Sequence, residues 1–231
     1  MTTNIVLVRH CESIGNIAFQ QSFFQQDDTM YTEEFVACSS LKWKLSEYGK
    51  KHAAEIGSYL RRMSFDNIFV SDSRRTIETV EFMAIPSAQL VVTGLLRERD
   101  YAGLECKPKR DWLRCATDLN EAMRSMTWKP PGGESMEDIA ARVSSFLNTH
   151  VSKNLSTLIV THGDIIQAMR MALLGLDEVA REMFRNIQGN YVRTGQIFFY
   201  ERQDSGEYTE RTSHFDGTKW HDLSVTFNKS S

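Results

Sequence analysis

Two histidines each follow an apolar run, and together they could act on an anion. His10 follows the run at 4–9, and His162 follows the run at 157–161. Apolar, β-branched runs of this length are typical of buried parallel strands, whose carboxyl ends meet at one edge of a sheet. An imidazole with an unprotonated nitrogen can attack phosphorus. Arg9, directly before His10, would hold an anion there, because guanidinium keeps its charge and donates through paired N–H groups.

The elements that must position these side chains alternate along the chain. Further apolar runs predict strands at 66–71, 89–93 and 196–200. Apolar spacing on one face predicts helices that begin near Ser46, Ser73, Ser135 and Asp164. Strands that alternate with helices indicate an α/β fold, which we expect to be a three-layer α/β/α domain with a mostly parallel central sheet.

The chain length suits a single domain, and we expect residues 1–231 to form one. Residues 17–40 show no clear apolar period, and we interpret them as a cap or lid segment over the site. Residues 96–112 are charged and contain Gly103 and Pro108, which predicts a loop. The polar tail at 203–231 predicts no defined element.

Composition and charge exclude several classes of function. A net charge of −3 provides no basic field for nucleic acid or an anionic membrane surface. No apolar run approaches the roughly 20 residues that span a bilayer, and we expect no secretory signal. The four cysteines include no CxxC pair, which favours free thiols in a reducing cytoplasm. We therefore expect a cytoplasmic protein; its oligomeric state stays open, a dimer included.

Short sequence blocks resemble, in order, motifs of the histidine phosphatase superfamily, which includes the cofactor-dependent phosphoglycerate mutases. The blocks are Arg9-His10-x-Glu12-Ser13, Ser71-x-x-x-Arg75-x-x-x-Thr79, Leu96-x-Glu98 with Gly103-Leu104-Glu105, and His162-Gly163. The resemblance runs from residue 5 to about residue 175. It implies a phosphoglycerate mutase-like fold and an enzyme that transfers phosphoryl groups.

The resemblance also implies a role for each chemical group at the sheet edge. His10 would be the nucleophile that forms a phosphohistidine. Arg9 and Arg75 would hold the phosphoryl oxygens, and His162 would donate a hydrogen bond to the same group. Each of these residues has a plainer reading: a histidine satisfied by backbone groups, or an arginine on a solvated helix face. The motif spacing favours the functional reading.

Glu98 is the candidate general acid, because the leaving alkoxide needs a proton. Asp100 and Glu105 are the alternatives, and Glu98 could also be one more charge in a solvated loop. The other substrate-binding residues that the resemblance implies are Ser13, Asn16 and Gly163.

Several positions depart from the family pattern. Cys11 stands where the motif has glycine, which puts the shape of the pocket in question. Asp164 stands where the mutases carry asparagine, and its charge argues against an acidic substrate. Lys107, Lys109 and Arg110 either bind a second acidic group on the substrate or form a solvated basic turn.

These observations predict a metal-independent phosphatase that hydrolyses small phosphomonoesters through a phosphohistidine on His10. No cluster of residues has the spacing of metal ligands, so we expect neither a metal nor another cofactor. One alternative is a cofactor-dependent phosphoglycerate mutase. A second alternative is a catalytically weak binding module.

Overall fold

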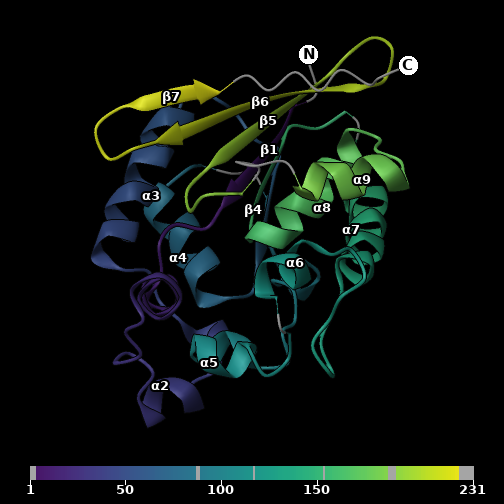
Figure 1. Ribbon diagram of the computed structural model, residues 1–231. Helices are drawn as coiled ribbons and strands as arrows, with labels where there is room; N and C mark the ends of the chain where they lie inside the picture. The colour runs from purple at the N-terminus through teal and green to yellow at the C-terminus, as the bar shows by residue number, and fades with distance from the viewer. Residues whose placement is uncertain (1–3, 87–88, 117, 153, 187–190, 224–231) are drawn as a thin grey trace.

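A computed structural model describes residues 4–86, 89–116, 118–152, 154–186 and 191–223, and in them one seven-stranded sheet runs through the molecule (Figure 1). Its strands are β1 (Asn4–Arg9), β2 (Asn67–Ser71), β3 (Gln89–Thr93), β4 (Thr157–Thr161), β5 (Ile197–Arg202), β6 (Tyr208–Phe215) and β7 (Trp220–Leu223). The strand order is β3-β2-β4-β1-β5-β6-β7. The first four strands in this order are parallel, and β5, β6 and β7 are antiparallel to their neighbours.

The predicted α/β fold is confirmed. The sheet is mixed, because β5 runs antiparallel to β1 and the tail adds the antiparallel strands β6 and β7, where the sequence predicted no element. Residues 203–206 turn the chain between β5 and β6, and Gly206 has the positive φ of 88° that such a turn requires. The side chains of β6 alternate only weakly between buried and exposed positions. This weak alternation explains why the sequence predicted no strand there.

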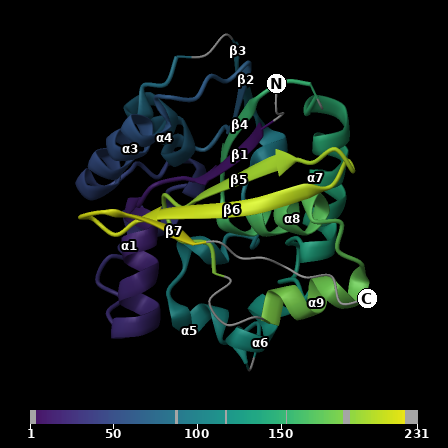
Figure 2. The ribbon, with the colours of Figure 1, turned by 90° about the horizontal axis from the view of Figure 1, so that it is seen from above.

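Helices cover both faces of the sheet (Figure 2). The four longest of the described part are α3 (Glu47–Leu60), α4 (Arg74–Met83), α7 (Met136–His150) and α8 (Gly163–Leu173), and α9 (Glu178–Asn186) follows α8. One buried apolar cluster joins the sheet to α7 and α8, and a second joins it to α3 and α4. In β1, Ile5 and Leu7 belong to the first cluster while Val6 and Val8 belong to the second, as the two-residue period of a strand requires.

The helices begin close to the predicted positions. Ser46 caps α3 by accepting the Gly49 N–H at 2.9 Å, and Ser135 caps α7 in a capping box with Asp138. Ser73 precedes α4, and α8 starts at Gly163. Among the described helices, none combines the length and the apolar composition needed to span a bilayer.

The segment at 17–40 is more helical than its sequence predicted. It contains most of α1 (Ile14–Gln20), a π-helix (Gln21–Gln25), α2 (Glu33–Ala37) and the start of a 3-10 turn (Ser40–Lys42). The ring of Phe23 stacks on that of Phe19 at 3.9 Å and contacts Trp112, away from the sheet. The change from an α- to a π-helix interrupts the usual apolar period, so no helical pattern was visible in this segment.

The predicted loop at 96–112 also contains regular turns. The chain between β3 and α7 holds 3-10 turns at Gly94–Leu96 and Leu104–Cys106, then α5 (Lys109–Trp112) and α6 (Leu119–Arg124). Lys109 Nζ donates to the Phe23 carbonyl at 3.1 Å, and Arg110 pairs with Asp28 at 2.5 Å. These two basic residues therefore connect α5 to the segment at 17–40, and neither lines the cavity at the carboxyl ends of β1 and β4.

His52 predicts an acid-sensitive point in this fold. The ring on α3 is 3% exposed, and neither nitrogen has a hydrogen-bond partner among the described residues. Burial, and then His214, lowers the pKa of His52 to about 4 from 6.5. Between about pH 4 and pH 6.5 the His52 imidazole binds more protons in the unfolded chain than in the native state, so acid destabilises the native state. We expect the free energy of unfolding to fall by about 2 kcal/mol from this group between pH 7.5 and pH 5.

Urea unfolding of the wild type and of His52→Leu at the two pH values checks this expectation. The leucine variant should lose less stability on acidification, because it has no imidazole to protonate in the unfolded chain. The same loss in both proteins would contradict it.

Candidate active site

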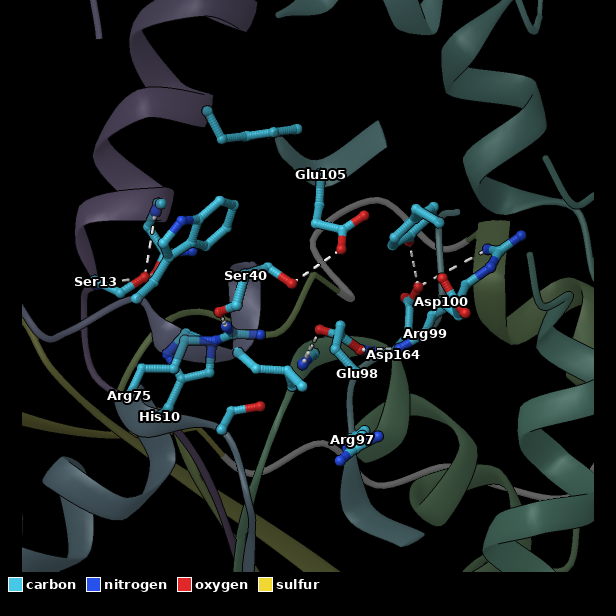
Figure 3. A pocket seen from close by; sticks show the side chains of 18 of the residues that line it. His10, Ser13, Ser40, Arg75, Arg97, Glu98, Arg99, Asp100, Glu105 and Asp164 are labelled. Carbon is cyan, nitrogen blue, oxygen red and sulfur yellow. Dashed lines mark hydrogen bonds and ion pairs between the residues drawn. The ribbon is translucent and has the colours of Figure 1, made fainter. Parts of the chain in front are cut away.

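The carboxyl ends of β1 and β4 bring His10 and His162 together. Arg9 pairs with Thr161 in the parallel register, and the His10 N–H donates to the Thr161 carbonyl at 2.9 Å. The two imidazole centroids are 5.2 Å apart. Both rings are buried. His10 lines a cavity of about 600 Å³ (Figure 3), whereas His162 is not among the residues that line it.

Hydrogen bonds on both sides of the His10 ring determine which nitrogen carries the proton. Nδ1 donates to the Cys11 carbonyl at 2.7 Å, because a carbonyl can only accept. Nε2 accepts from Arg75 Nε at 3.2 Å. Burial, followed by the charges of Arg75 and Arg9, lowers the pKa of His10 well below its ordinary value. The ring is therefore neutral near pH 7, with its lone pair on Nε2.

Arg75 connects the two histidines. Its guanidinium donates from Nη2 to His162 Nδ1 at 3.2 Å and from Nη1 to the Ser40 carbonyl at 2.7 Å, besides its bond to His10. The side chain comes from the first turn of α4 and is buried. One planar cation thus fixes the relative positions of both imidazoles and of the chain at Ser40.

His162 is oriented from its other side. Nε2 lies 2.9 Å from Ser71 Oγ and 3.4 Å from Ser73 Oγ, and donates because Nδ1 accepts from Arg75. Burial, and then Arg75 and His10, lowers the pKa of His162 well below its ordinary value. The second imidazole is therefore also neutral near pH 7.

Arg9 lies beside the two rings at the same end of the cavity. Nη1 donates to the Tyr191 hydroxyl at 2.9 Å and to the Val192 carbonyl, and the guanidinium lies 5.4 Å from the Tyr191 ring centroid. Nε is buried without a hydrogen-bond partner among the described residues. Arg9 and Arg75 give this end of the cavity its positive charge.

The Glu98 carboxylate closes the amino end of α8. Oε2 accepts the Gly163 N–H at 3.0 Å, and Oε1 accepts the Asp164 N–H at 3.2 Å. Burial, followed by the charge of Asp164, raises the pKa of Glu98, against the opposite effect of Arg9. A raised pKa suits a carboxyl group that has to donate a proton. The Gly163 N–H, expected to bind substrate, contacts Glu98 in this arrangement.

Among the described residues, the two alternative acids have other hydrogen-bond partners than the amino end of α8. Asp100 is exposed and accepts the Ala102 N–H at 2.7 Å. Glu105 accepts the Ser40 hydroxyl at 2.9 Å (Figure 3). Both line the cavity. Glu98 stays the candidate acid, because it lies at the end of the helix that His162 precedes.

Ser13 and Asn16 form the wall on the α1 side. Ser13 caps α1, and its N–H and hydroxyl donate to Asn16 Oδ1 at 3.0 Å and 2.9 Å. With its amide oxygen held in this way, Asn16 has its NH₂ group as the donor for a ligand. Both residues line the cavity, as the proposed role in substrate binding requires.

Cys11 does not alter the cavity. Its side chain is fully buried in the core cluster with α3 and α4, and its N–H donates to Thr79 Oγ1 at 3.1 Å. Burial raises the pKa of its thiol well above the ordinary range. The neighbouring residues His10 and Ser13 line the cavity instead, so the cysteine leaves the space beside the imidazoles open.

The sequence did not predict several contacts of the site. Tyr191 contacts Arg9, and Ser40 contacts Arg75 through its backbone carbonyl. Neither residue belongs to a motif or a periodic segment, so no sequence signal marked them. In the described part of the chain, no group of three His, Cys, Asp or Glu side chains is placed to hold a metal ion.

Comparisons with known proteins agree on one family. A sequence model of the histidine phosphatase superfamily (branch 1) matches residues 5–201. The 2,3-bisphosphoglycerate-dependent phosphoglycerate mutase of Bartonella bacilliformis is 31% identical over 190 residues, which cover 76% of this chain and 84% of the mutase. Fructose-2,6-bisphosphatase TIGAR B of Danio rerio is 29% identical over 139 residues, or 58% of this chain and 53% of that protein. The match therefore spans about half of the latter.

A solved structure of a mycobacterial glucosyl-3-phosphoglycerate phosphatase is similar in fold. It superposes with a TM-score of 0.65 at 20% identity, covering 92% of this chain and 97% of the phosphatase chain. At this identity, the likeness concerns the arrangement of the helices and strands.

Proposed function

The chain belongs to the histidine phosphatase superfamily, and from this premise we infer that it hydrolyses phosphomonoesters through a phosphohistidine on His10. The observation that carries the proposal is the Arg75 guanidinium, which donates to His10 Nε2 and His162 Nδ1 at 3.2 Å each. Two neutral imidazoles and a fixed cation suit a tetrahedral dianion better than they suit a neutral ligand.

The reaction has two displacements. His10 Nε2 attacks phosphorus, the ester P–O bond breaks, and Glu98 gives its proton to the leaving oxygen. Water then attacks the phosphohistidine, Glu98 accepts a proton from that water, and the P–N bond breaks to release inorganic phosphate. The bond from Nδ1 to the Cys11 carbonyl stabilises the positive ring of the intermediate. Arg9 and Arg75 hold the phosphoryl oxygens, whose charge changes in both steps. His162 was expected to donate to the same group, but its N–H donates to Ser71, and the ring instead orients Arg75.

The charges of the cavity wall favour hydrolysis over the mutase reaction. A phosphoglycerate mutase must also hold the carboxylate of its substrate. Beyond Arg9 and Arg75, the described wall has three arginines, and each lies against a carboxylate of the protein. The pairs are Arg97 with Asp72 at 2.6 Å, Arg142 with Glu134 at 2.8 Å, and Arg99 with Asp164 at 3.8 Å. These pairs leave less positive charge for an acidic substrate.

A product assay tests the proposal. The protein is incubated with p-nitrophenyl phosphate, and separately with 3-phosphoglycerate with and without a bisphosphoglycerate primer. We expect inorganic phosphate from the aryl ester, no 2-phosphoglycerate, and an acid-labile phosphoenzyme after rapid quenching. Primer-dependent formation of 2-phosphoglycerate would instead indicate a mutase. No turnover of any ester and no phosphoenzyme would indicate a binding module.

Glu98→Gln should slow the release of poor leaving groups more than that of good ones. An alkyl phosphate releases an alkoxide that needs a proton, so kcat should fall by about 10²–10⁴-fold. p-Nitrophenolate needs little protonation, so the rate of its release should fall by about tenfold or less. Single-turnover rates with both esters measure the difference.

Asp100→Asn is the matched control, because it removes a negative charge from the same loop and the same cavity wall. This control should change the rates for both esters by a similar factor. If Glu98→Gln also affects both leaving groups equally, Glu98 is not the proton donor.

A further inference from the structure

We propose that the outer part of the cavity is a subsite for an alcohol that carries hydroxyl groups and no second acidic group, recognised by Trp43 and Glu105. The substrate class would then be phosphomonoesters of polyols or sugars. The inference rests on the proposed function, because it takes the end with His10 and Arg75 as the place of the phosphate.

Aromatic rings form much of the cavity wall. Five phenylalanine, tryptophan and tyrosine side chains line the cavity: Tyr191, which contacts Arg9, and Phe19, Trp43, Tyr101 and Trp112. The ring centroids of Tyr101 and Trp112 are 5.0 Å apart, and those of Phe19 and Trp112 are 6.5 Å apart. Ring faces are electron-rich and attract the C–H groups of a polyol or sugar. This wall can therefore bind the C–H groups of a ligand as well as its polar groups.

Two polar atoms of this wall are buried without a hydrogen-bond partner among the described residues. One is Trp43 Nε1, which can only donate, and the other is Glu105 Oε2, which accepts. A buried polar atom without a partner destabilises the free protein, so a ligand that supplies the partner removes that cost when it binds. Hydroxyl groups can both accept from the indole and donate to the carboxylate. An ammonium group could serve only Glu105, and a carboxylate could serve only Trp43.

The other oxygen of Glu105 fixes the carboxylate beside the phosphate end. Ser40 Oγ donates to Glu105 Oε1 at 2.9 Å, while the Ser40 carbonyl accepts from Arg75 at 2.7 Å. Figure 3 shows Ser40 between Glu105 and Arg75. A group bound to Glu105 would thus be separated only by Ser40 from the Arg75 guanidinium that holds the phosphate.

Negative charge in the outer wall opposes a second anionic group on the substrate. Glu105 and Asp100 both line the cavity, and neither has an ion-pair partner in the parts of the chain that the structure describes. A second phosphate or a carboxylate on the substrate would approach these negative charges and be repelled by them. The wall therefore selects against bisphosphates and phosphorylated acids.

The test compares ligands that differ in one group. Glycerol 3-phosphate and 3-phosphoglycerate differ only by a hydroxymethyl group in place of a carboxylate, and propyl phosphate lacks both hydroxyls. The variant His10→Ala allows binding to be measured by calorimetry without turnover. We expect glycerol 3-phosphate to bind at least about tenfold more tightly than either of the other two.

Two substitutions in that background assign the preference to its residues. Glu105→Gln should reduce the ratio of the affinities for glycerol 3-phosphate and 3-phosphoglycerate by about tenfold or more. The reason is that it removes the repulsion between the Glu105 carboxylate and that of 3-phosphoglycerate. Trp43→Phe should reduce the ratio of the affinities for glycerol 3-phosphate and propyl phosphate, because it removes the N–H donor and keeps an aromatic ring. The control is Glu55→Gln on the exposed face of α3, which should leave both preferences as they are.

Equal affinities for the three ligands, or preferences that neither substitution changes, would overturn the subsite. Such a result would leave the proposed function intact if wild-type protein still forms a phosphoenzyme with p-nitrophenyl phosphate. The reverse result, selective binding without a phosphoenzyme, would overturn the proposed function and keep the subsite.

Discussion

Replacing His10 with alanine should lower phosphoester turnover by about 10⁴-fold or more. The reason is that the variant lacks the nitrogen that accepts the phosphoryl group, and no other imidazole can take its place. His162 is the nearest ring, but its Nδ1 accepts from Arg75 and its Nε2 contacts Ser71. Steady-state rates with p-nitrophenyl phosphate and acid-labile phosphoenzyme after quenching measure the effect.

The control for this substitution is His150→Ala, at the exposed end of α7 and outside the cavity wall. It should keep the wild-type rate within about threefold, as an exposed substitution away from the site usually does. Both variants should unfold cooperatively, which thermal unfolding checks. A His10→Ala protein that is folded and still forms a phosphoenzyme would show that another residue is the nucleophile.

The positions of the two imidazoles could be predicted because strand geometry determines them. His10 and His162 each follow an apolar run, and the parallel pairing of β1 with β4 places them side by side at the same sheet edge. Arg75 needed one more step, the motif spacing from Ser71, because a helix residue could equally face solvent. Its neighbour Arg74, half exposed and paired with Glu78, does so.

The groups that orient these residues could not be predicted in the same way. Ser40 holds Arg75 through a backbone carbonyl, which every residue possesses, so its sequence carries no mark of that role. Tyr191 holds Arg9 across 182 positions of sequence, from a stretch without a periodic pattern. Both contacts depend on where loops return to the sheet edge, and local propensity does not determine that.

The effect of the Asp164 charge depends on neighbours that are distant in the sequence. Its carboxylate was expected to oppose an acidic substrate. The structure surrounds it with Arg185 at 3.3 Å, Arg99 at 3.8 Å and the Tyr101 hydroxyl at 2.6 Å. Burial would raise the pKa of Asp164, but these partners outweigh burial and lower it. Its charge is therefore compensated, and in the subsite proposed above the repulsion of acidic substrates comes from Glu105 and Asp100.

Replacing Arg75 with alanine should lower kcat/KM by about 10²–10³-fold, the usual effect of losing one charged donor to a transition state. Arg75→Lys should restore little of this loss. The guanidinium donates along three directions, to His10, to His162 and to the Ser40 carbonyl, whereas an ammonium on a flexible stem cannot reproduce that fixed fork. Steady-state kinetics with p-nitrophenyl phosphate and competition by inorganic phosphate measure both variants.

Arg74→Ala separates the effect of the site from that of positive charge on α4. The Arg74 side chain is 45% exposed and pairs with Glu78 at 2.8 Å, so its removal leaves the anion site untouched. We expect a change in kcat/KM below about threefold, together with unchanged competition by phosphate. If Arg74→Ala and Arg75→Ala weakened phosphate competition equally, the long-range field of the helix would bind the anion. If only Arg75→Ala does so, the anion is bound by direct contact with Arg75, the cation that contacts both imidazoles.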